Sequence, residues 1–229
     1  MSFTGLPKDF FDFFVELKEN NNRAWFEDNN PRYQESVQEP LLCFVEDMAP
    51  RLKKISKHFV ADPRKNRGSV FRIYRDVRFS KDKTPYKTHG AIQFRHARGK
   101  DAHAPGFYVH LAPDEIRYGG GVWTPAAPAL LKIREAIRDT PKAWTKIVEH
   151  PDFKNHFDHL RGDSLTRPPK GFSHDDPCLE YLKHKSFFAM AKGKKSATRK
   201  TQFLDDVEQA MIKAKPMMKF LTNAVGAPF

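Results

Sequence analysis

The spacing of apolar residues changes twice along this 229-residue chain, and that change constrains the fold more than any other feature. Near the N-terminus, apolar side chains recur every three or four residues, which is typical of amphipathic helices. From residue 69 they alternate with polar side chains, which is the two-residue period of a strand. From residue 125 the helical period returns. The order of the patterns predicts helices, then a sheet, then helices.

The N-terminal helical segment covers residues 7–56. A first helix is predicted over 7–19 and ends at Asn20-Asn21-Asn22, a run that favours a turn. The following segment keeps one apolar face as far as Ile55. Pro40 and Pro50 lie within it, and proline removes a helical hydrogen bond, so we expect a kink or break there.

Four short segments between residues 69 and 119 have the composition of strands. Pro113-Asp114 lies between the last two and is typical of a hairpin turn. We therefore expect an antiparallel sheet of about four strands. The four segments are 69–75, 90–97, 105–113 and 115–121.

Helices are expected again over residues 125–223. Thr124 is suited to cap the first of them and Pro125 to begin it. Residues 141–157 read as another helix, while 160–177 are rich in turn-forming residues. Residues 178–200 begin with a helical pattern and become basic. The last segment reads as a helix kinked near Pro216.

These segments are expected to share one hydrophobic core. The chain is 39% apolar and its length suits one large domain. We find no internal repeat and no low-complexity linker. The predicted fold is α+β, a single domain over residues 1–229 with helices 7–56 and 125–223 packed on a sheet at 69–119.

The formal net charge of +12 favours acidic partners such as nucleic acids or phosphorylated metabolites. Its distribution is uneven. Residues 64–100 contain twelve Lys or Arg and only two Asp or Glu, whereas residues 1–63 contain eight and eleven. A concentrated excess of positive charge points to a binding site more strongly than an even one.

The densest charge lies in the predicted loop Arg75–Lys87, which Arg72 precedes. We call residues 72–87 together the basic loop. If the loop folds back on itself, its cations can converge on one phosphate group, with arginine giving bidentate contacts and lysine point charges. The alternative is a solvated loop in which Asp–Arg and Asp–Lys pairs merely hold a turn. The predicted anion-binding cations are Arg72, Arg75, Arg78, Lys81, Lys83 and Lys87.

Three other residues of the basic loop carry further predictions. Asp76 and Asp82 can orient the arginines, bind a metal ion or act as an acid or base. Tyr86 can stack on a base or a sugar. We also expected Val77, Phe79 and Tyr86 to anchor the loop by packing.

Two further segments are candidates for anion binding. Gly119, Gly120 and Gly121 precede a predicted helix start, where exposed backbone N–H groups can hold an anion. The alternative is that these glycines only turn a strand tightly into a helix. Lys183 and Lys185 would join the basic loop in one cleft if the fold brings them together.

Other kinds of site have little support in the sequence. His89 follows the basic loop and is a candidate acid or base, although a hydrogen-bonded turn histidine is the simpler interpretation. Cys43 and Cys178 are far apart and have no metal-ligand spacing. No motif indicates a cofactor or a metal site. No stretch is apolar enough to span a membrane, and we expect a cytoplasmic protein.

Several motifs together resemble a known family. They are "NNNRAWF", "FRIYRDVRFSKDKTPYKTH", "YGGGVWTP", "LTRPPKGF" and "YLKHKSFFA". With them the chain is similar to an uncharacterised family catalogued as a domain of unknown function (number 2461), whose signature is RDxRFSKDKxPYK. The resemblance covers roughly residues 3–223. It implies one established sequence unit and no established activity.

Two functions remain open from the sequence. The first is a protein that binds phosphate or a polyanion, a nucleic acid or nucleotide, through the basic loop. The second is an enzyme acting on a phosphorylated or carboxylated small molecule, with Asp76 or Asp82 as acid, base or metal ligand.

Overall fold

A five-stranded antiparallel sheet forms the centre of the protein, in the order β1-β2-β3-β4-β5. The computed structural model describes residues 2–99 and 104–229. It confirms a single α+β domain, with one more strand than the approximate count predicted. The predicted sheet range includes 100–103, which lie outside the described residues. The strands are β1 (Phe59–Val60), β2 (Gly90–His96), β3 (Gly106–Leu111), β4 (Ile116–Val122) and β5 (Phe187–Lys192).

The N-terminal helices follow one another with little interruption. Pro50 lies inside α4 without ending it, so the break predicted there is absent. At Pro40 the helix changes character instead: a π-helical segment ends just before it, which accommodates a residue that has no N–H group to donate. The elements are α1 (Asp9–Glu19), α2 (Arg23–Asp28), α3 (Asn30–Tyr33), η1 (Gln34–Gln38) and α4 (Glu39–Ile55).

The C-terminal part contains most of the remaining helices, with β5 between two of them. The predicted cap at Thr124 is wrong: Thr124 N donates to Ser186 Oγ (2.8 Å), which ties it to the residue before β5, and the helix begins at Ala127. The single helix expected over 141–157 is two helices. The elements are α5 (Ala127–Asp139), α6 (Pro141–Val148), α7 (Pro151–Phe157), α8 (Leu179–Leu182), α9 (Lys195–Thr198) and α10 (Gln202–Ala224).

Two predictions about strands are wrong. Residues 69–75 form no strand, because this segment only touches the edge of β2. Phe71 N donates to Ala91 O (2.9 Å) and Gln93 N to Ser69 O (2.8 Å), and the chain then leaves the sheet for the basic loop. Conversely, no strand is predicted in residues 178–200, which begin with a helical pattern and become basic, yet β5 lies in this segment and completes the sheet beside β4.

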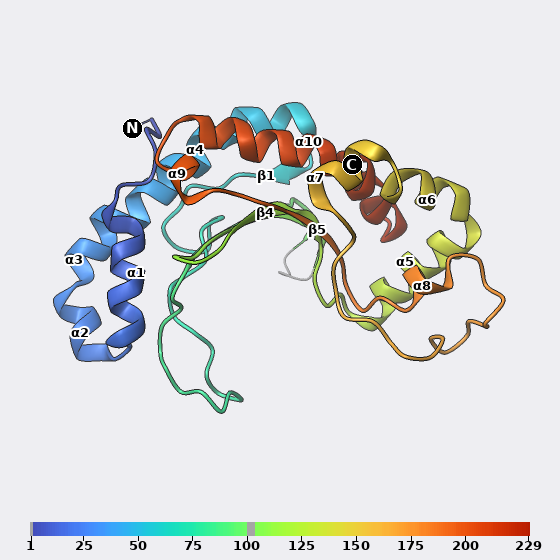
Figure 1. Cartoon of the computed structure of the whole chain (residues 1–229), viewed down its shortest axis with the longest axis horizontal. Coiled ribbons are helices and arrows are strands. Elements are labelled where there is room, and N and C mark those ends of the chain that lie inside the picture. The colour runs from blue at the N-terminus through green and yellow to red at the C-terminus, as the bar shows by residue number, and fades with distance from the viewer. Residues whose placement is uncertain (1, 100–103) are drawn as a thin grey trace.

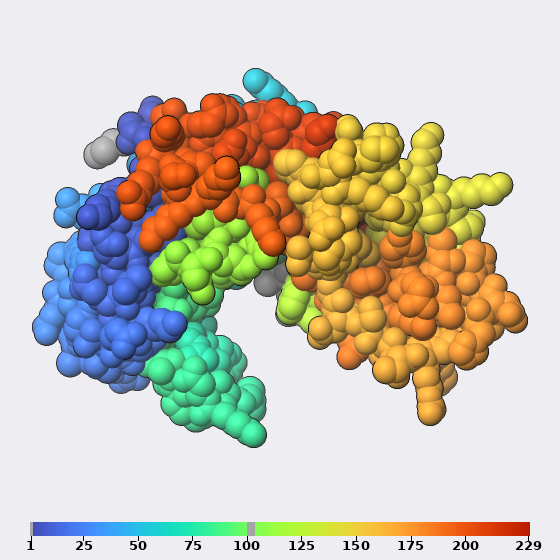
Figure 2. Space-filling model, in the orientation of Figure 1, coloured from blue at the N-terminus to red at the C-terminus, as the bar shows by residue number. Residues whose placement is uncertain are grey.

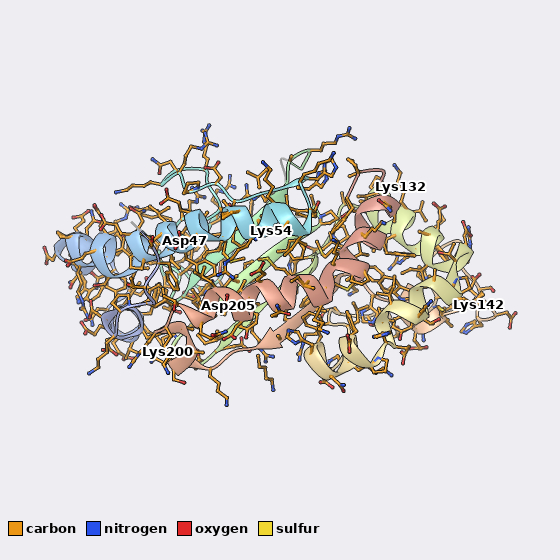
Figure 3. The ribbon with its side chains drawn as sticks, turned by 90° about the horizontal axis from the view of Figure 1, so that it is seen from above. Asp47, Lys54, Lys132, Lys142, Lys200 and Asp205 are labelled. Carbon is orange, nitrogen blue, oxygen red and sulfur yellow. The ribbon has the colours of Figure 1, made fainter. Side chains whose placement is uncertain are left out.

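One face of the sheet is covered by helices. α4 and α10 lie side by side across it, as seen from above in Figure 3, where Asp47 and Lys54 mark α4 and Asp205 marks α10. Arg51 of α4 forms an ion pair with Asp205 of α10 (2.6 Å). Fully buried side chains from β2 and β3 face these helices, among them Phe94, Phe107 and Val109.

No helix of the described residues lies across the opposite face of the sheet (Figure 1). Figure 1 shows α1 to α3 and the basic loop on one side of this face and α5 to α8 on the other. The space-filling view in Figure 2 shows a deep hollow between these two halves, with the sheet as its roof. The candidate site lies here.

Candidate ligand groove

Strand pairing places alternate residues of four strands in rows on the open face of the sheet. One row runs Gln93, Tyr108, Gly119, Met190 from β2 to β5. The next row runs Arg95, Gly106, Gly121, Phe188, and a third runs Ala91, His110, Arg117, Lys192. Residues far apart in the sequence therefore line one surface.

Four cavities adjoin along this face because neighbouring cavities share lining residues. The one at the basic loop shares His89 with the next, which shares His110 and Glu115 with the cavity over the middle of the sheet. That cavity, of about 530 Å³, shares Arg117 and Phe188 with the last one, near α8. We call this continuous depression the sheet groove.

The neck of the basic loop is closed by backbone hydrogen bonds. Arg75 N donates to Pro85 O (2.8 Å) and Lys87 N to Ile73 O (2.8 Å). Asn21, from the turn after α1, exchanges two hydrogen bonds of 3.0 Å with the backbone of Tyr86. The loop is therefore fixed at its base to the N-terminal helices.

Four of the six cations of the basic loop have partners within the loop. Arg75 contacts Asp82 (2.5 Å) and Thr84, and Arg78 contacts Asp76 (2.7 Å). Lys83 Nζ donates to Val77 O (2.9 Å), and Lys87 Nζ donates to Arg72 O (2.6 Å) and Tyr74 O (2.8 Å). These contacts agree with the alternative interpretation, in which pairs within the loop hold a turn.

The two loop aspartates are weak bases. The Arg78 side chain lowers the pKa of Asp76 to about 2. Hydrogen bonds from Thr84 N–H and from Arg75 lower the pKa of Asp82 to about 2. Both carboxylates are charged at neutral pH and bind a proton weakly. They are therefore better suited to orienting the arginines than to accepting a proton from a ligand.

The remaining two cations, Arg72 and Lys81, are exposed and have no side-chain partner among the described residues. Between them in sequence, Phe79 is 95% exposed, so it does not anchor the loop as expected. Arg78 lies 5.8 Å from the centre of its ring. The loop thus presents cations and an aromatic ring together to solvent.

Tyr86 is the residue that anchors the basic loop. It is only 4% exposed, and its ring stacks on Phe26 with centroids 4.2 Å apart. The ring is therefore covered by protein, which contradicts its predicted role of stacking on a base or a sugar.

The three glycines lie inside β4 rather than in a turn before a helix. β4 pairs with β3 on one side and with β5 on the other, which engages its backbone in the sheet. The predicted cradle of exposed N–H groups at a helix start is therefore not formed by Gly119, Gly120 and Gly121. Gly121 has φ 148°, a conformation that favours glycine.

Lys183 and Lys185 do not join the basic loop. They lie just after α8, on the far side of the open face from residues 72–87 in Figure 1. Lys183 Nζ is paired with Glu180 (2.7 Å). The single basic cleft considered from the sequence is not formed.

His89 lies in the sheet groove beside a second histidine that the sequence did not single out. The rings of His89 and His110 have centroids 4.4 Å apart, and Tyr108 Oη lies 3.3 Å from His110 Nδ1. Burial lowers the pKa of His89 to about 4, and it also lowers the pKa of His110. Both imidazoles are neutral at pH 7 and can exchange hydrogen bonds with a ligand.

Sequence reasoning missed the polar residues at the far end of the groove. Arg117 Nε donates to Glu115 (2.7 Å), which leaves Nη1 buried without a hydrogen-bond partner among the described residues. Arg161 Nε and His184 Nδ1 are in the same state, and all three side chains line one cavity. No signal in the sequence joins them, because the pairing of β4 with β5 brings them together.

The described residues contain no cluster of three or more His, Cys, Asp or Glu that could hold a metal ion. The carboxylates expected as metal ligands, Asp76 and Asp82, are each paired with an arginine instead. In the described part of the chain, no helix has the length and apolar character that a membrane span requires.

The fold and the groove define an α+β protein with one face of its sheet open to ligands. The chain belongs to the family described as "Conserved hypothetical protein (DUF2461)", whose model matches residues 9–220. No curated protein and no solved structure matches it significantly.

Proposed function

We propose that this protein binds a polyanion that carries phosphate groups, a nucleic acid or a nucleotide, at the basic loop. The observation that carries the proposal is the loop surface itself: among the described residues, no hydrogen bond or ion pair holds the side chains of Arg72 and Lys81, and Phe79 between them is almost fully exposed. Cations beside an exposed aromatic ring are the combination that single-stranded nucleic acids bind, by phosphate contact and base stacking.

The arrangement of the loop supports the same function. The internal ion pairs orient Arg75 and Arg78 beside the loop edge without burying them in the core. The cavity at the base of the loop leads into the sheet groove, which gives a bound strand a path. We also expect the protein in the cytoplasm, where such ligands occur.

Catalysis on a phosphorylated or carboxylated small molecule is a second candidate function, favoured by the His89–His110 pair in the groove. In this case the histidines replace Asp76 and Asp82 as the acid and base, because both aspartates have a pKa near 2. Its test is turnover: His89→Gln should abolish any phosphatase or nuclease activity of the purified protein.

Salt-dependent binding tests the polyanion proposal. Labelled single-stranded DNA, duplex DNA and RNA are titrated with the protein, and anisotropy is followed at several salt concentrations. Arg72→Ala and Lys81→Ala should each weaken binding and reduce the slope of log affinity against log salt by about one. Phe79→Ala should weaken binding to single strands by about 5- to 100-fold, the value of one stacked base.

Lys54→Ala is the matched control, because it removes the same charge from α4, on the helix-covered side of the sheet (Figure 3). If the polyanion binds at the basic loop, its affinity for Lys54→Ala should stay close to its affinity for the wild type. Equal losses in Lys54→Ala and Lys81→Ala would mean that net charge alone attracts the polyanion, and the proposal would fail.

A further inference from the structure

The cavity over the middle of the sheet owes its depth to glycines. In the row that contains Arg95 and Phe188, the two positions between them are Gly106 and Gly121. Neighbouring strands lie about 4.8 Å apart, so two missing side chains leave an opening of roughly 14 Å between the flanking residues. Gly119 is the single glycine between Tyr108 and Met190 in the next row, which leaves a narrower gap of roughly 10 Å. We call this cavity the glycine pocket.

Aromatic side chains form the walls of the glycine pocket. Phe71 and Tyr108 lie on one side, with ring centroids 6.2 Å apart. Trp123 and Phe188 lie on the other, with centroids 5.1 Å apart. Its volume of about 530 Å³ falls in the range of small-molecule sites. A flat floor between aromatic walls suits a planar ring, which can stack on either wall.

Hydrogen-bonding groups are present where such a ring would lie. Gln93 lines the pocket, and its Oε1 accepts a hydrogen bond from Arg95 Nε (3.1 Å). Arg95 in turn lies over the ring of Phe71, 5.7 Å from its centre. An amide held in place in this way can recognise the edge of a planar base.

Two arginines meet at the end of the pocket that faces α8. Arg117 lines both the glycine pocket and the adjoining cavity, to which Arg161 also belongs. Arg117 Nη1 and Arg161 Nε are buried N–H groups that no described residue accepts from. Glu115 and Asp163 also line these cavities, so their negative charges offset part of the positive charge of the arginines. Glu115 holds Arg117 through Nε and leaves Nη1 directed elsewhere.

From these observations we propose that the glycine pocket binds the base of a nucleotide unit and that Arg117 and Arg161 bind the phosphate of the same unit. The proposal deepens the proposed function: it rests on a phosphate-bearing ligand and identifies the part of that ligand read by the sheet. In a single-stranded nucleic acid, the basic loop then contacts phosphates further along the strand.

The test uses ligands too short to reach both the glycine pocket and the basic loop. AMP, GMP, CMP and UMP are titrated by calorimetry, with adenosine and inorganic phosphate as partial ligands. At least one mononucleotide should bind more tightly than either partial ligand. Arg117→Gln should weaken it about 10- to 100-fold, the value of one charge-assisted hydrogen bond, without changing adenosine binding.

Trp123→Leu is the second variant, and it should weaken mononucleotide and adenosine binding alike. Trp123 is 56% exposed, so this replacement removes an aromatic wall with little effect on the core. Lys54→Ala, on α4 at the helix-covered face of the sheet (Figure 3), should leave mononucleotide binding unchanged. Melting temperatures of all variants verify that they fold.

Two results would overturn the proposal: no mononucleotide binds at millimolar concentration, or binding is the same in Arg117→Gln and Trp123→Leu as in the wild type. Neither result bears on the binding of a nucleic acid strand at the basic loop. A different result is oligonucleotide binding that depends on salt and yet is the same in Arg72→Ala and Lys81→Ala as in the wild type. That result would contradict the function proposed for the basic loop. The proposal for the glycine pocket would still hold if mononucleotides bind there.

Discussion

At the scale of single residues, the carboxylates of the basic loop decide how many cations are available. Asp76 accepts hydrogen bonds from Arg78 Nε (2.9 Å) and Nη2 (2.7 Å), and a longer one from Arg78 N (3.3 Å). Asp82 engages Arg75 and accepts shorter hydrogen bonds from Thr84 N and Thr84 Oγ1 (2.9 Å each), so it holds the backbone of the turn more firmly. The two aspartates should therefore respond differently to removal of their charge.

We expect Asp76→Asn to tighten binding of single-stranded DNA by about 3- to 10-fold at low salt, because it removes a negative charge and frees the guanidinium of Arg78. Asp82→Asn should weaken binding, because it loosens the turn that positions Arg75. Anisotropy titrations of both variants check this. If Asp76→Asn abolishes a turnover reaction and leaves affinity unchanged, Asp76 is catalytic and the expectation is wrong.

His89 gives a prediction about pH. Its pKa is about 4 in the folded protein and 6.5 in its ordinary state, so between these values the unfolded chain binds the proton and the folded chain does not. Stability should fall as pH drops from about 6.5 to 4. Over that pH range, the free energy of unfolding of His89→Asn should fall by about 1 kcal/mol less than that of the wild type. This value is reduced because His89 is partly exposed to solvent.

Urea unfolding at several pH values measures this difference. His174→Asn is the matched control, because it makes the same replacement at an exposed histidine in the loop before α8. An unchanged pH dependence in His89→Asn would mean that the imidazole takes up its proton without opposing the fold.

At the scale of elements, β4 depends on its glycines. A Cβ added to Gly121 would lie 2.2 Å from Phe187 O, and one added to Gly119 would lie 2.0 Å from Ala189 O. These contacts come from the backbone of β5, which cannot move away without breaking the pairing. Both glycines allow β4 and β5 to approach, and Gly121 also lines the glycine pocket.

Gly121→Ala should therefore destabilise the protein by more than about 3 kcal/mol. Gly171→Ala is the matched control, since Gly171 also has a positive φ (89°) but its added Cβ meets nothing within 4 Å. Backbone strain alone should cost this control about 1 kcal/mol. Equal losses in urea unfolding would show that only φ matters and that β5 yields to the new side chain.

The elements that the sequence predicted well are those with long, regular patterns. The helical faces of α1 and α4 and the alternation in β3 are read directly from apolar spacing. β5 was missed because six residues, "FFAMAK", fit a buried strand or a helix equally well, and basic residues follow. Residues 69–75 have the alternation of a strand but meet the sheet only at its edge.

At the scale of the whole molecule, the basic loop could be located from charge alone, but the sheet groove could not. Its lining comes from β2, β3, β4, β5 and the segment around Arg161. Which of these side chains share a face depends on strand order and register, and no local pattern fixes either. The same reason explains why Lys183 and Lys185, basic and close to β5 in sequence, lie away from the loop.

The three tryptophans report on three parts of the molecule and give a prediction at this scale. Trp25 packs on Phe13 in the N-terminal helices, Trp123 lines the glycine pocket, and Trp144 is fully buried beneath α10.

On adding a short single-stranded oligonucleotide, the indole N–H signal of Trp123 should shift most in the ¹H–¹⁵N NMR spectrum, because ring stacking acts at close range. Trp144 should stay in place. In Arg117→Gln, a higher oligonucleotide concentration should be needed to produce the same shift of the Trp123 signal. A shift of Trp144 as large as that of Trp123 would mean that binding rearranges the core, and ligand contact with the open face would then not explain the spectrum.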